Sequence, residues 1–457
     1  MRLGDASPQM PRQLELPLGG RGEAPRAGRS EEASTAAHGI ERPGASGLLA
    51  ASLERRNLRA ALKRVRQNQG SPGIDGMTVE ELPDWLRENW PRVREQLLAG
   101  TYRPQPVKRQ TIPKRGGGVR ELGIPPVLDR FIQQALLQVL QPRIDPSFSA
   151  HSYGFRPGRR AHDAVVAAQR YVQEGRRWVV DLDLEKFFDR VHHDVLMERL
   201  ARRIADRSVL RLIRRYLEAG VMVSGVKVDR HEGTPQGGPL SPLLANVLLD
   251  EVDRELERRG HAFVRYADDC NVYVRSRRAG ERVMAWMVRV YARLHLRINP
   301  DKSAVARATS RSFLGFAFWV GPGGRIRRRV APDALRTMKD RVRGLTRRTR
   351  GRSLAQVAED LRGYLPGWKA YFHLAETPGV FSDLDEWIRH RLRALQLKHW
   401  KRGRTVFREL RARGMSERAA AAVAANARRW WKSSALAIHI ALPNKHFDEL
   451  GVPRLAA

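Results

Sequence analysis

Two adjacent carboxylates, Asp268 and Asp269, lie in the middle of an apolar stretch, residues 263–274. β-branched and aromatic residues flank the pair on both sides, a pattern that predicts a strand, a tight turn and a second strand. Two carboxylates held side by side repel each other unless a cation neutralises them. Because the stretch offers oxygen ligands and no histidine, Mg²⁺ suits it better than zinc. The alternative is a hairpin turn that merely contains aspartates.

A second acidic stretch, residues 178–184, precedes this pair in the chain. Alternation along a strand places Asp181 and Asp183 on one face, and an acidic face on an apolar strand is costly unless it holds a cation. Asp183 together with Asp268 and Asp269 would hold two Mg²⁺ about 4 Å apart for in-line phosphoryl transfer. One ion would activate an attacking 3′-hydroxyl and the other would stabilise the departing pyrophosphate. For Asp181 we favour an ion pair with an arginine.

The composition agrees with an enzyme that acts on nucleic acid. The 457 residues include 84 Lys and Arg against 49 Asp and Glu, which gives a net charge of +35. Such a basic chain should bind polyanions with a salt-sensitive affinity. A hydrophobic content of 42% is ordinary for a globular protein, and no apolar run is long enough to predict a membrane span. One cysteine excludes a disulfide framework within the chain, and without an apolar signal segment the expected location is the cytoplasm, in a nucleoid-associated ribonucleoprotein.

The chain divides by composition into four parts. Residues 1–46 are rich in Gly, Pro, Ala and Arg, which predicts a disordered leader, and their six arginines balance six acidic residues. Helical and strand patterns alternate over residues 47–322, which predicts an α+β fold. Basic amphipathic helices follow over 323–430, so a boundary is expected near 321–324, and residues 431–457 form a short extension.

Two loops between these elements could bind phosphate or a base pair. A glycine turn within residues 112–120 is bracketed by Lys114 and Arg120, which could grip a triphosphate; a plain hairpin is the alternative. A second loop, residues 233–242, leads into a helix expected at 243–256 and could place Gln236 near an incoming nucleotide. Ser241 is expected to cap that helix, with Pro242 in its first turn.

Seven motifs in order resemble the group II intron-encoded reverse transcriptase/maturase family, in its bacterial, endonuclease-free form. They cover two fingers motifs, the first catalytic palm motif, the Pro-Gln-Gly motif, the Tyr-Ala-Asp-Asp box and two motifs that close the palm: residues 112–130, 151–159, 183–189, 234–242, 266–269, 296–303 and 313–316. The resemblance runs from about residue 53 to 452. It implies a right-hand polymerase of fingers and palm with an α-helical thumb and domain X.

The resemblance also implies roles for single residues. Asp183, Asp268 and Asp269 take the catalytic, metal-binding positions, with the carbonyl of Leu184 as a further ligand. Nucleotide-binding positions fall on Lys114, Arg120, Phe187, Gln236 and Lys302. Phe187 would be the gate against a ribose 2′-hydroxyl, with Phe188 ranked lower because it is more simply read as core. Lys302 would donate a proton near the pyrophosphate or be a surface charge, and Cys270 is expected to pack within its strand.

The C-terminal part resembles the thumb and RNA-binding domain X. A basic stretch, expected to cover more than one face of a helix and to bind RNA, contains Arg336, Lys339, Arg341, Arg343, Arg347, Arg348, Arg350 and Arg352. Aromatic and apolar side chains of residues 361–372 share a helical face and are expected to form core. Base stacking by Trp430 and Trp431 is a weaker hypothesis. The paired cysteines of the family's DNA endonuclease are not present in the sequence.

The family therefore implies an RNA-directed DNA polymerase that also assists intron splicing and mobility. Expected partners are group II intron RNA, an RNA template with a DNA or RNA primer, dNTPs and target DNA, with two Mg²⁺ as cofactor and no membrane. One alternative is a non-catalytic RNA-binding maturase on a decayed polymerase scaffold. Another is a domesticated reverse transcriptase in phage defence or CRISPR adaptation.

Overall fold

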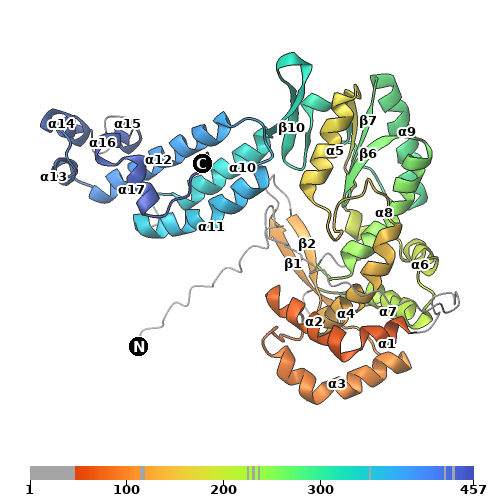
Figure 1. Cartoon of the computed structure of the whole chain (residues 1–457). Helices are drawn as coiled ribbons and strands as arrows, with labels where there is room; N and C mark the ends of the chain where they lie inside the picture. The colour runs from red at the N-terminus through yellow and green to blue at the C-terminus, as the bar shows by residue number, and fades with distance from the viewer. Residues whose placement is uncertain are drawn as a thin grey trace, which may run out of the picture. The chain divides into compact units, whose positions relative to one another are not determined.

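The protein folds into two compact units in this computed structural model (Figure 1). The structure describes residues 47–113, 119–223, 226–228, 232–234, 237–348, 351–426, 429–434 and 438–456. The first unit extends to Arg311 and the second begins at Ser312, which is earlier than the boundary expected near residues 321–324. The expected disordered leader, residues 1–46, lies outside the described residues. The mixed α+β fold class is confirmed.

The first unit begins with helices and a small mixed sheet. Its early elements are α1 (Leu48–Ser52), α2 (Arg55–Gln67), α3 (Leu82–Ala99), β1 (Val107–Pro113), β2 (Val119–Ile124), α4 (Val127–Ile144), η1 (Asp145–Ser147) and α5 (Ala161–Gln173). Strands β4 (Val221–Val223) and β5 (Val226–Val228) complete the sheet in the order β2-β1-β4-β5. β1 and β2 pair antiparallel, and the glycine turn expected between them, residues 114–118, lies outside the described residues. Helix α4 packs against α2 and buries most of its length.

A second, antiparallel sheet holds both acidic stretches. It consists of β3 (Trp178–Leu182), β6 (Ala262–Tyr266), β7 (Asp269–Val274) and β8 (Ala304–Arg307), in the order β6-β7-β3-β8. The surrounding elements are η2 (Phe187–Asp189), α6 (His193–Ala201), α7 (Arg207–Glu218), α8 (Ser241–Arg258), α9 (Arg277–Arg293) and η3 (Ala308–Ser310). Helix α9 packs on β3, β7 and β8, and α5 packs on β6 and β7 from the opposite side (Figure 1).

Strand alternation separates apolar from acidic side chains on this sheet. Val180, Leu182, Cys270 and Val272 point to the face that α9 covers, and all are buried in the core. The intervening positions of β3 and β7 carry the aspartates on the other face. Cys270 therefore packs within the strand, as expected.

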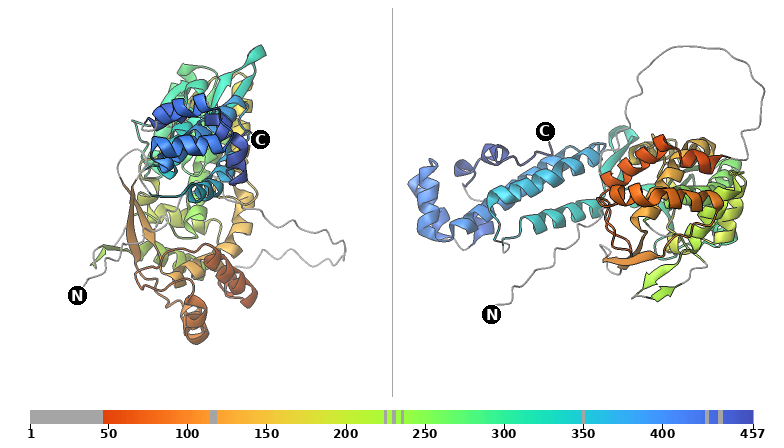
Figure 2. Two further views of the ribbon diagram at one scale, coloured as in Figure 1. Left: turned by 90° about the vertical axis from the view of Figure 1, so that its left-hand side faces the viewer. Right: turned by 90° about the horizontal axis from the view of Figure 1, so that it is seen from below.

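The second unit is a three-stranded antiparallel sheet followed only by helices. Its strands, in the order β11-β10-β9, are β9 (Ser312–Phe313), β10 (Phe316–Val320) and β11 (Ile326–Val330), with η4 (Pro322–Gly324) in the turn. The helices are α10 (Pro332–Leu345), α11 (Leu354–Phe372), α12 (Gly379–Trp400), α13 (Gly403–Ala412), α14 (Glu417–Ala425), α15 (Trp430–Ser434), α16 (Ile438–Ala441) and α17 (Asn444–Glu449). Helix α11 contacts both α10 and α12, and Figure 2 shows the three from two further directions.

The structure bears out the apolar face expected over residues 361–372. Leu361, Leu365, Trp368 and Phe372 are buried on one side of α11. The basic stretch does not form one helix, however, because α10 ends at Leu345. Arg347 and Arg348 lie beyond it, and Arg350 is outside the described residues. No helix in the described part of the chain is long and apolar enough to cross a membrane.

Candidate active site

The acidic pair lies at a two-residue turn between β6 and β7. Tyr266 pairs with Asp269, so the turn consists of Ala267 and Asp268, and Ala267 adopts a left-handed φ of 58°. In the ladder between β3 and β7, Leu182 lies opposite Cys270. One residue further along, the same register sets Asp183 across from Asp269. Two acidic stretches separated in sequence thus meet at one end of the sheet.

The environment of Asp269 is unfavourable for a lone carboxylate. Burial raises its pKa well above the ordinary value, and the nearby carboxylates of Asp181, Asp268 and Asp183 raise it further. Oxygen donors crowded together in this way fit a hard divalent cation, which would remove the mutual repulsion. In the part of the chain described, no three Asp, Glu, His or Cys side chains are close enough to hold a metal as they stand. Lys302 Nζ instead lies 3.3 Å from Asp183 Oδ2.

Asp181 has the ion pair expected for it. A guanidinium nitrogen of Arg311 lies 2.6 Å from its Oδ2, and the amide of Asn271 can donate to its Oδ1 over 3.0 Å. Burial nonetheless leaves the pKa of Asp181 above its usual value. Arg311 also donates to the carbonyl of Lys302, at 2.6 Å. Asp181 is therefore a structural anchor beside the acidic turn.

The segment after α9 holds Asp183 in place. The backbone amide of Asp183 donates to Ser303 Oγ at 3.0 Å, and the carbonyl of Asp183 accepts from the amide of Asn299 at 2.8 Å. A bridge between Leu184 and Ile298 lies between these bonds. This bridge uses the carbonyl of Asp183 and the amide of Glu185, and does not engage the carbonyl of Leu184. The motif at 296–303 therefore supports the acidic stretch that follows β3.

A buried arginine fixes the acidic turn from below. The side chain of Arg265 is 0% exposed and forms an ion pair with Asp253 of α8 at 2.6 Å. It also donates to Asn246 Oδ1, to Ser152 Oγ and, at 2.9 Å, to the carbonyl of Ala267 in the turn. A guanidinium spreads five donors over a rigid fork, so one side chain can tie these groups together.

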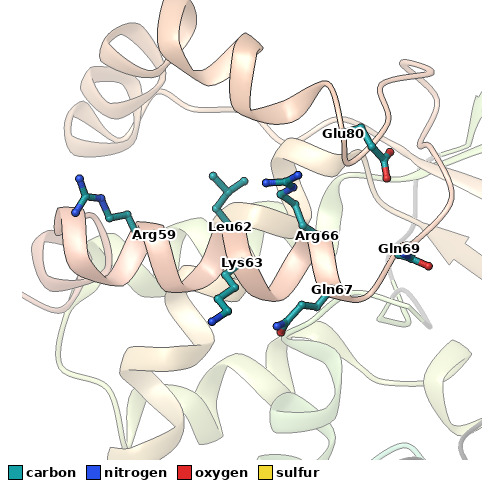
Figure 3. Close-up of a pocket in the computed structure, with 7 residues that line it drawn as sticks. All are labelled: Arg59, Leu62, Lys63, Arg66, Gln67, Gln69 and Glu80. Atoms are coloured by element: carbon teal, nitrogen blue, oxygen red, sulfur yellow. The ribbon is translucent and has the colours of Figure 1, made fainter.

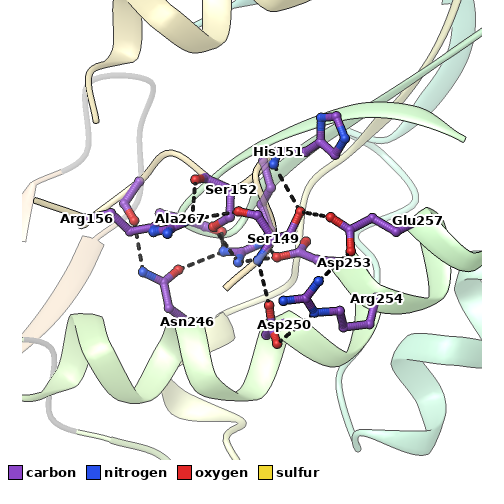
Figure 4. Close-up of polar contacts among 12 residues, drawn as sticks. Ser149, His151, Ser152, Arg156, Asn246, Asp250, Asp253, Arg254, Glu257 and Ala267 are labelled. Carbon is purple, nitrogen blue, oxygen red and sulfur yellow. Dashed lines mark hydrogen bonds and ion pairs between the residues drawn. The ribbon is translucent and has the colours of Figure 1, made fainter. Parts of the chain in front are cut away.

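The segment 149–156 packs against the same turn (Figure 4). Gly154 approaches it so closely that a Cβ there would lie 2.1 Å from the amide nitrogen of Ala267. Asp250 of α8 accepts from the amide of Ser149 at 3.1 Å, and Asn246 donates to the carbonyl of Gly154 at 2.9 Å. The second fingers motif and α8 therefore position the acidic turn. Sequence reasoning missed Arg265, although a charged residue within an apolar strand was the available signal.

Two family models match the chain in adjoining regions. Residues 112–318 match "Reverse transcriptase (RNA-dependent DNA polymerase)", and residues 335–414 match "Group II intron, maturase-specific domain". The chain belongs to the group II intron reverse transcriptase/maturase family. The first match contains Asp181, Asp183, Asp268 and Asp269, and the second covers most of α10 through α13.

Relatives agree with this assignment over part of their length. The chain is 39% identical over 193 residues to "Protein YkfC" of Escherichia coli, which is 41% of this chain and 51% of that protein. It is 35% identical over 195 residues to "Group II intron-encoded protein LtrA" of Lactococcus lactis, which is 42% of this chain and 32% of that protein. The matches thus span about half or less of these relatives. Among solved structures, telomerase from Candida albicans matches with a TM-score of 0.40 and 13% identity, over 67% of this chain and 63% of that chain.

The expected nucleotide-binding residues of the reverse transcriptase domain are only partly described. Lys114 and Gln236 lie outside the described residues, and for Arg120 only the backbone, in β2, is described. Phe187 is 3% exposed and belongs to the core, whereas Phe188 is partly exposed and packs against it. This reverses our expectation that Phe188 is the core ring.

The predicted cap of α8 is wrong. The helix begins at Ser241 itself, after Leu240, and no side chain caps it. The hydroxyl of Ser241 lies 3.2 Å from Thr234 Oγ1 instead. That bond joins Thr234 to the first residue of α8.

A basic helix that sequence reasoning did not single out lies near the start of the reverse transcriptase unit. Helix α2 carries six exposed cations and no acidic residue: Arg55, Arg56, Arg59, Lys63, Arg64 and Arg66. In the described part of the chain, none of them forms an ion pair. Arg59, Lys63 and Arg66 line an open hollow of about 500 Å³, and Figure 3 shows their side chains projecting from several sides of α2. Such an unneutralised helix is suited to a polyanion.

The predicted RNA-binding arginines of the maturase domain all lie on its surface. Arg341 and Arg343 are exposed on α10, and Arg343 forms an ion pair with Asp340 at 2.6 Å. Arg347 and Arg348 are exposed just after the helix. Two of the four also lie near tryptophan rings, Arg343 at Trp387 and Arg348 at Trp430.

Proposed function

We propose that this protein is an RNA-directed DNA polymerase that copies intron RNA into cDNA. The observation that supports it best is the register of β3 and β7, which sets Asp183 across from Asp269 and beside Asp268. The burial of Asp269 among carboxylates that repel it has a chemical reason if two divalent cations are held there. A non-catalytic maturase would have no such reason to keep them.

In this proposal Asp183, Asp268, Asp269 and the Leu184 carbonyl hold two Mg²⁺. When bound, the ions activate the primer 3′-hydroxyl and neutralise the charge of the departing pyrophosphate. Lys302, whose ammonium lies 3.3 Å from Asp183 Oδ2, would supply a proton donor beside that site. Lys114, Arg120 and Gln236 bind the incoming nucleotide, and the gate against ribose falls to the Phe187–Phe188 pair. The partly exposed Phe188 is better placed for contact than Phe187.

The maturase domain, we further propose, binds the intron RNA and so assists splicing and mobility. The match to the maturase-specific family and the name of the relative LtrA support this. The exposed arginines at 341–348 and the unpaired cations of α2 offer phosphate contacts in the two units. A primer, an RNA template, dNTPs and target DNA complete the expected partners. The second candidate is a role in phage defence or CRISPR adaptation. The genes that surround this one would distinguish that role from an intron function.

Primer extension tests the polymerase assignment. Replacing both Asp268 and Asp269 with Ala should abolish Mg²⁺-dependent extension of a primer on an RNA template, because the cations lose two carboxylate ligands. Binding of the chain to RNA should be largely unchanged, since no basic surface is altered. A matched control replaces Asp84 and Glu88, exposed carboxylates of α3, and should extend normally. If the Asp268/Asp269 double variant still makes cDNA, the chemistry does not belong to this turn.

A further inference from the structure

Helix α12 carries two tryptophan-centred groups of cations along its length. Trp387 and Arg391 are four residues apart and Lys398 is eleven from Trp387, so all three lie near one face of the helix. Three cations surround the Trp387 ring: Lys339 at 5.8 Å, Arg343 at 5.7 Å and Arg391 at 5.3 Å from its centroid. Two of these come from α10, so the ring gathers charge from two helices.

The second group lies around Trp430, at the far end of the same face. Lys398 of α12 lies 5.0 Å from the centroid of this ring, and Arg348 lies 5.3 Å from it. Eleven residues of helix place the two groups about 16 Å apart along α12. We call the set the tryptophan track; its members are Lys339, Arg343, Arg348, Trp387, Arg391, Lys398 and Trp430.

The cations of this track are mostly not neutralised. Arg343 forms its ion pair with Asp340, but within the described residues the other four have no carboxylate partner. Arg391 is half-buried and donates to Thr346 Oγ1 at 2.7 Å and to the carbonyl of Arg343 at 3.5 Å. Burial, together with the charges of Arg343 and Arg348, lowers the pKa of Arg391 to about 10. The like charges are therefore close enough to repel one another.

Tryptophan rings can hold cations together without cancelling their charge. A cation near a ring face is attracted by the ring quadrupole, by about 0.5–1 kcal/mol at an exposed site. A carboxylate in place of the ring would neutralise the cation, which would then no longer attract an anion. The five cations around the two rings thus form an extended positive surface. Binding of a polyanion along this surface would relieve the repulsion between the cations.

We propose that the tryptophan track binds the phosphate backbone of folded RNA, a proposal that rests on the RNA-binding function of the maturase domain. RNA is favoured over an acidic peptide because its phosphates recur regularly along the whole length of the track. Trp387 and Trp430 act as holders of cations, not as base-stacking rings. Of the two tryptophans considered for stacking, only Trp431 keeps that role: it is 44% exposed and stacks on His390 with centroids 3.9 Å apart.

Binding of the full chain to a synthetic RNA stem-loop, measured over a range of salt concentrations, tests the track. Lys339→Met with Arg391→Met should lower the slope of log affinity against log salt by about 1 to 2, since up to two phosphate contacts are lost. The control, Arg277→Met with Lys445→Met, removes the same charge from exposed residues that already form ion pairs with Glu281 and Glu449. Its slope should match that of the unmodified chain.

A second variant removes a ring and no charge. Trp387→Leu should weaken binding by up to about tenfold, because three cations lose the face that holds them. The control is Trp319→Leu, which should bind RNA normally. The ring of Trp319 lies on the β10–β11 hairpin, and the Arg327 guanidinium is 5.9 Å from its centroid. Circular dichroism of each variant shows whether the helices are intact.

The outcomes separate the track from the broader function. If the unmodified chain fails to bind the stem-loop, the proposed RNA-binding function and the proposed role of the track are both wrong. If the unmodified chain binds but the Lys339/Arg391 variant behaves as its control, or Trp387→Leu binds normally, only the track is wrong. If polyglutamate competes for the chain as well as RNA does, the partner is an acidic protein and the proposal is overturned.

Discussion

The candidate catalytic aspartates could be recognised from sequence because an acid inside an apolar strand contradicts the strand's own pattern. Asp183, Asp268 and Asp269 all show that contradiction. Arg265 shows it equally, but its partners Asp253, Asn246 and Ser152 come from distant segments that only the fold brings together. Lys302 gave no such signal, since one lysine after a turn is typical of any surface. Anomalous side chains were therefore predictable, and their partners were not.

Removing the buried guanidinium beneath the turn should cost more than any surface change nearby. Arg265→Met leaves Asp253 buried without its cation and leaves the Ala267 carbonyl without its donor, so unfolding in urea should show a loss of about 3–5 kcal/mol. Adding Asp253→Leu should recover part of that loss, because a buried pair can be replaced by apolar groups more cheaply than it can be broken. Equal stabilities of the single and double variants would contradict this account. Both variants should extend primers poorly, because the turn loses its anchor.

Helices and strands with strong periodicity were predictable, whereas their ends were decided by tertiary contacts. α10 ends at Leu345 in a stretch with no proline nearby. Thr346 accepts from Arg391 of α12 while its hydroxyl bonds the carbonyl of Val342 at 2.6 Å, so a neighbouring helix contributes to the ending. The start of α8 was misjudged for a similar reason, since Thr234 engages the serine expected to cap it. Local sequence does not contain these partners.

The close packing of α9 on the sheet β6-β7-β3-β8 depends on one glycine. A Cβ on Gly280 would lie 2.5 Å from Val305 Cγ1, and valine is too stiff to move aside cheaply. Gly280→Ala should therefore destabilise the protein by about 1–3 kcal/mol in thermal or urea unfolding, as other overpacked cores do. The matched change Gly363→Ala, at an exposed position of α11 with nothing within 4 Å of the new Cβ, should instead stabilise it by about 0.5–1 kcal/mol. A stabilising Gly280→Ala would show that α9 can shift on the sheet.

Over the full chain, charge was predictable in amount but not in arrangement. The net charge of +35 indicated a polyanion partner, and the balanced first 46 residues assigned the whole excess to the remainder. Which cations are already paired could not be read from composition. Those of α2 have no ion pairs in the described residues, whereas Arg214 of α7 and Arg254 and Arg258 of α8 pair with acids on their own helices. The unpaired groups are the most readily available to a polyanion.

The first unit should fold without the second. Its hydrophobic core runs continuously from Leu49 to Leu296, within the residues that end at Arg311. A fragment of residues 47–311 should therefore unfold cooperatively and keep near-ultraviolet circular dichroism, because a single core of this size is enough for an independent domain. A fragment that ends at Ser310 is the control: it lacks Arg311, the cation paired with Asp181, and should be less stable by on the order of 1–2 kcal/mol. Failure of the longer fragment to fold would mean that the segment from Ser312 onward supplies part of the core, and equal stabilities would mean that the Arg311–Asp181 pair does not hold the acidic strand.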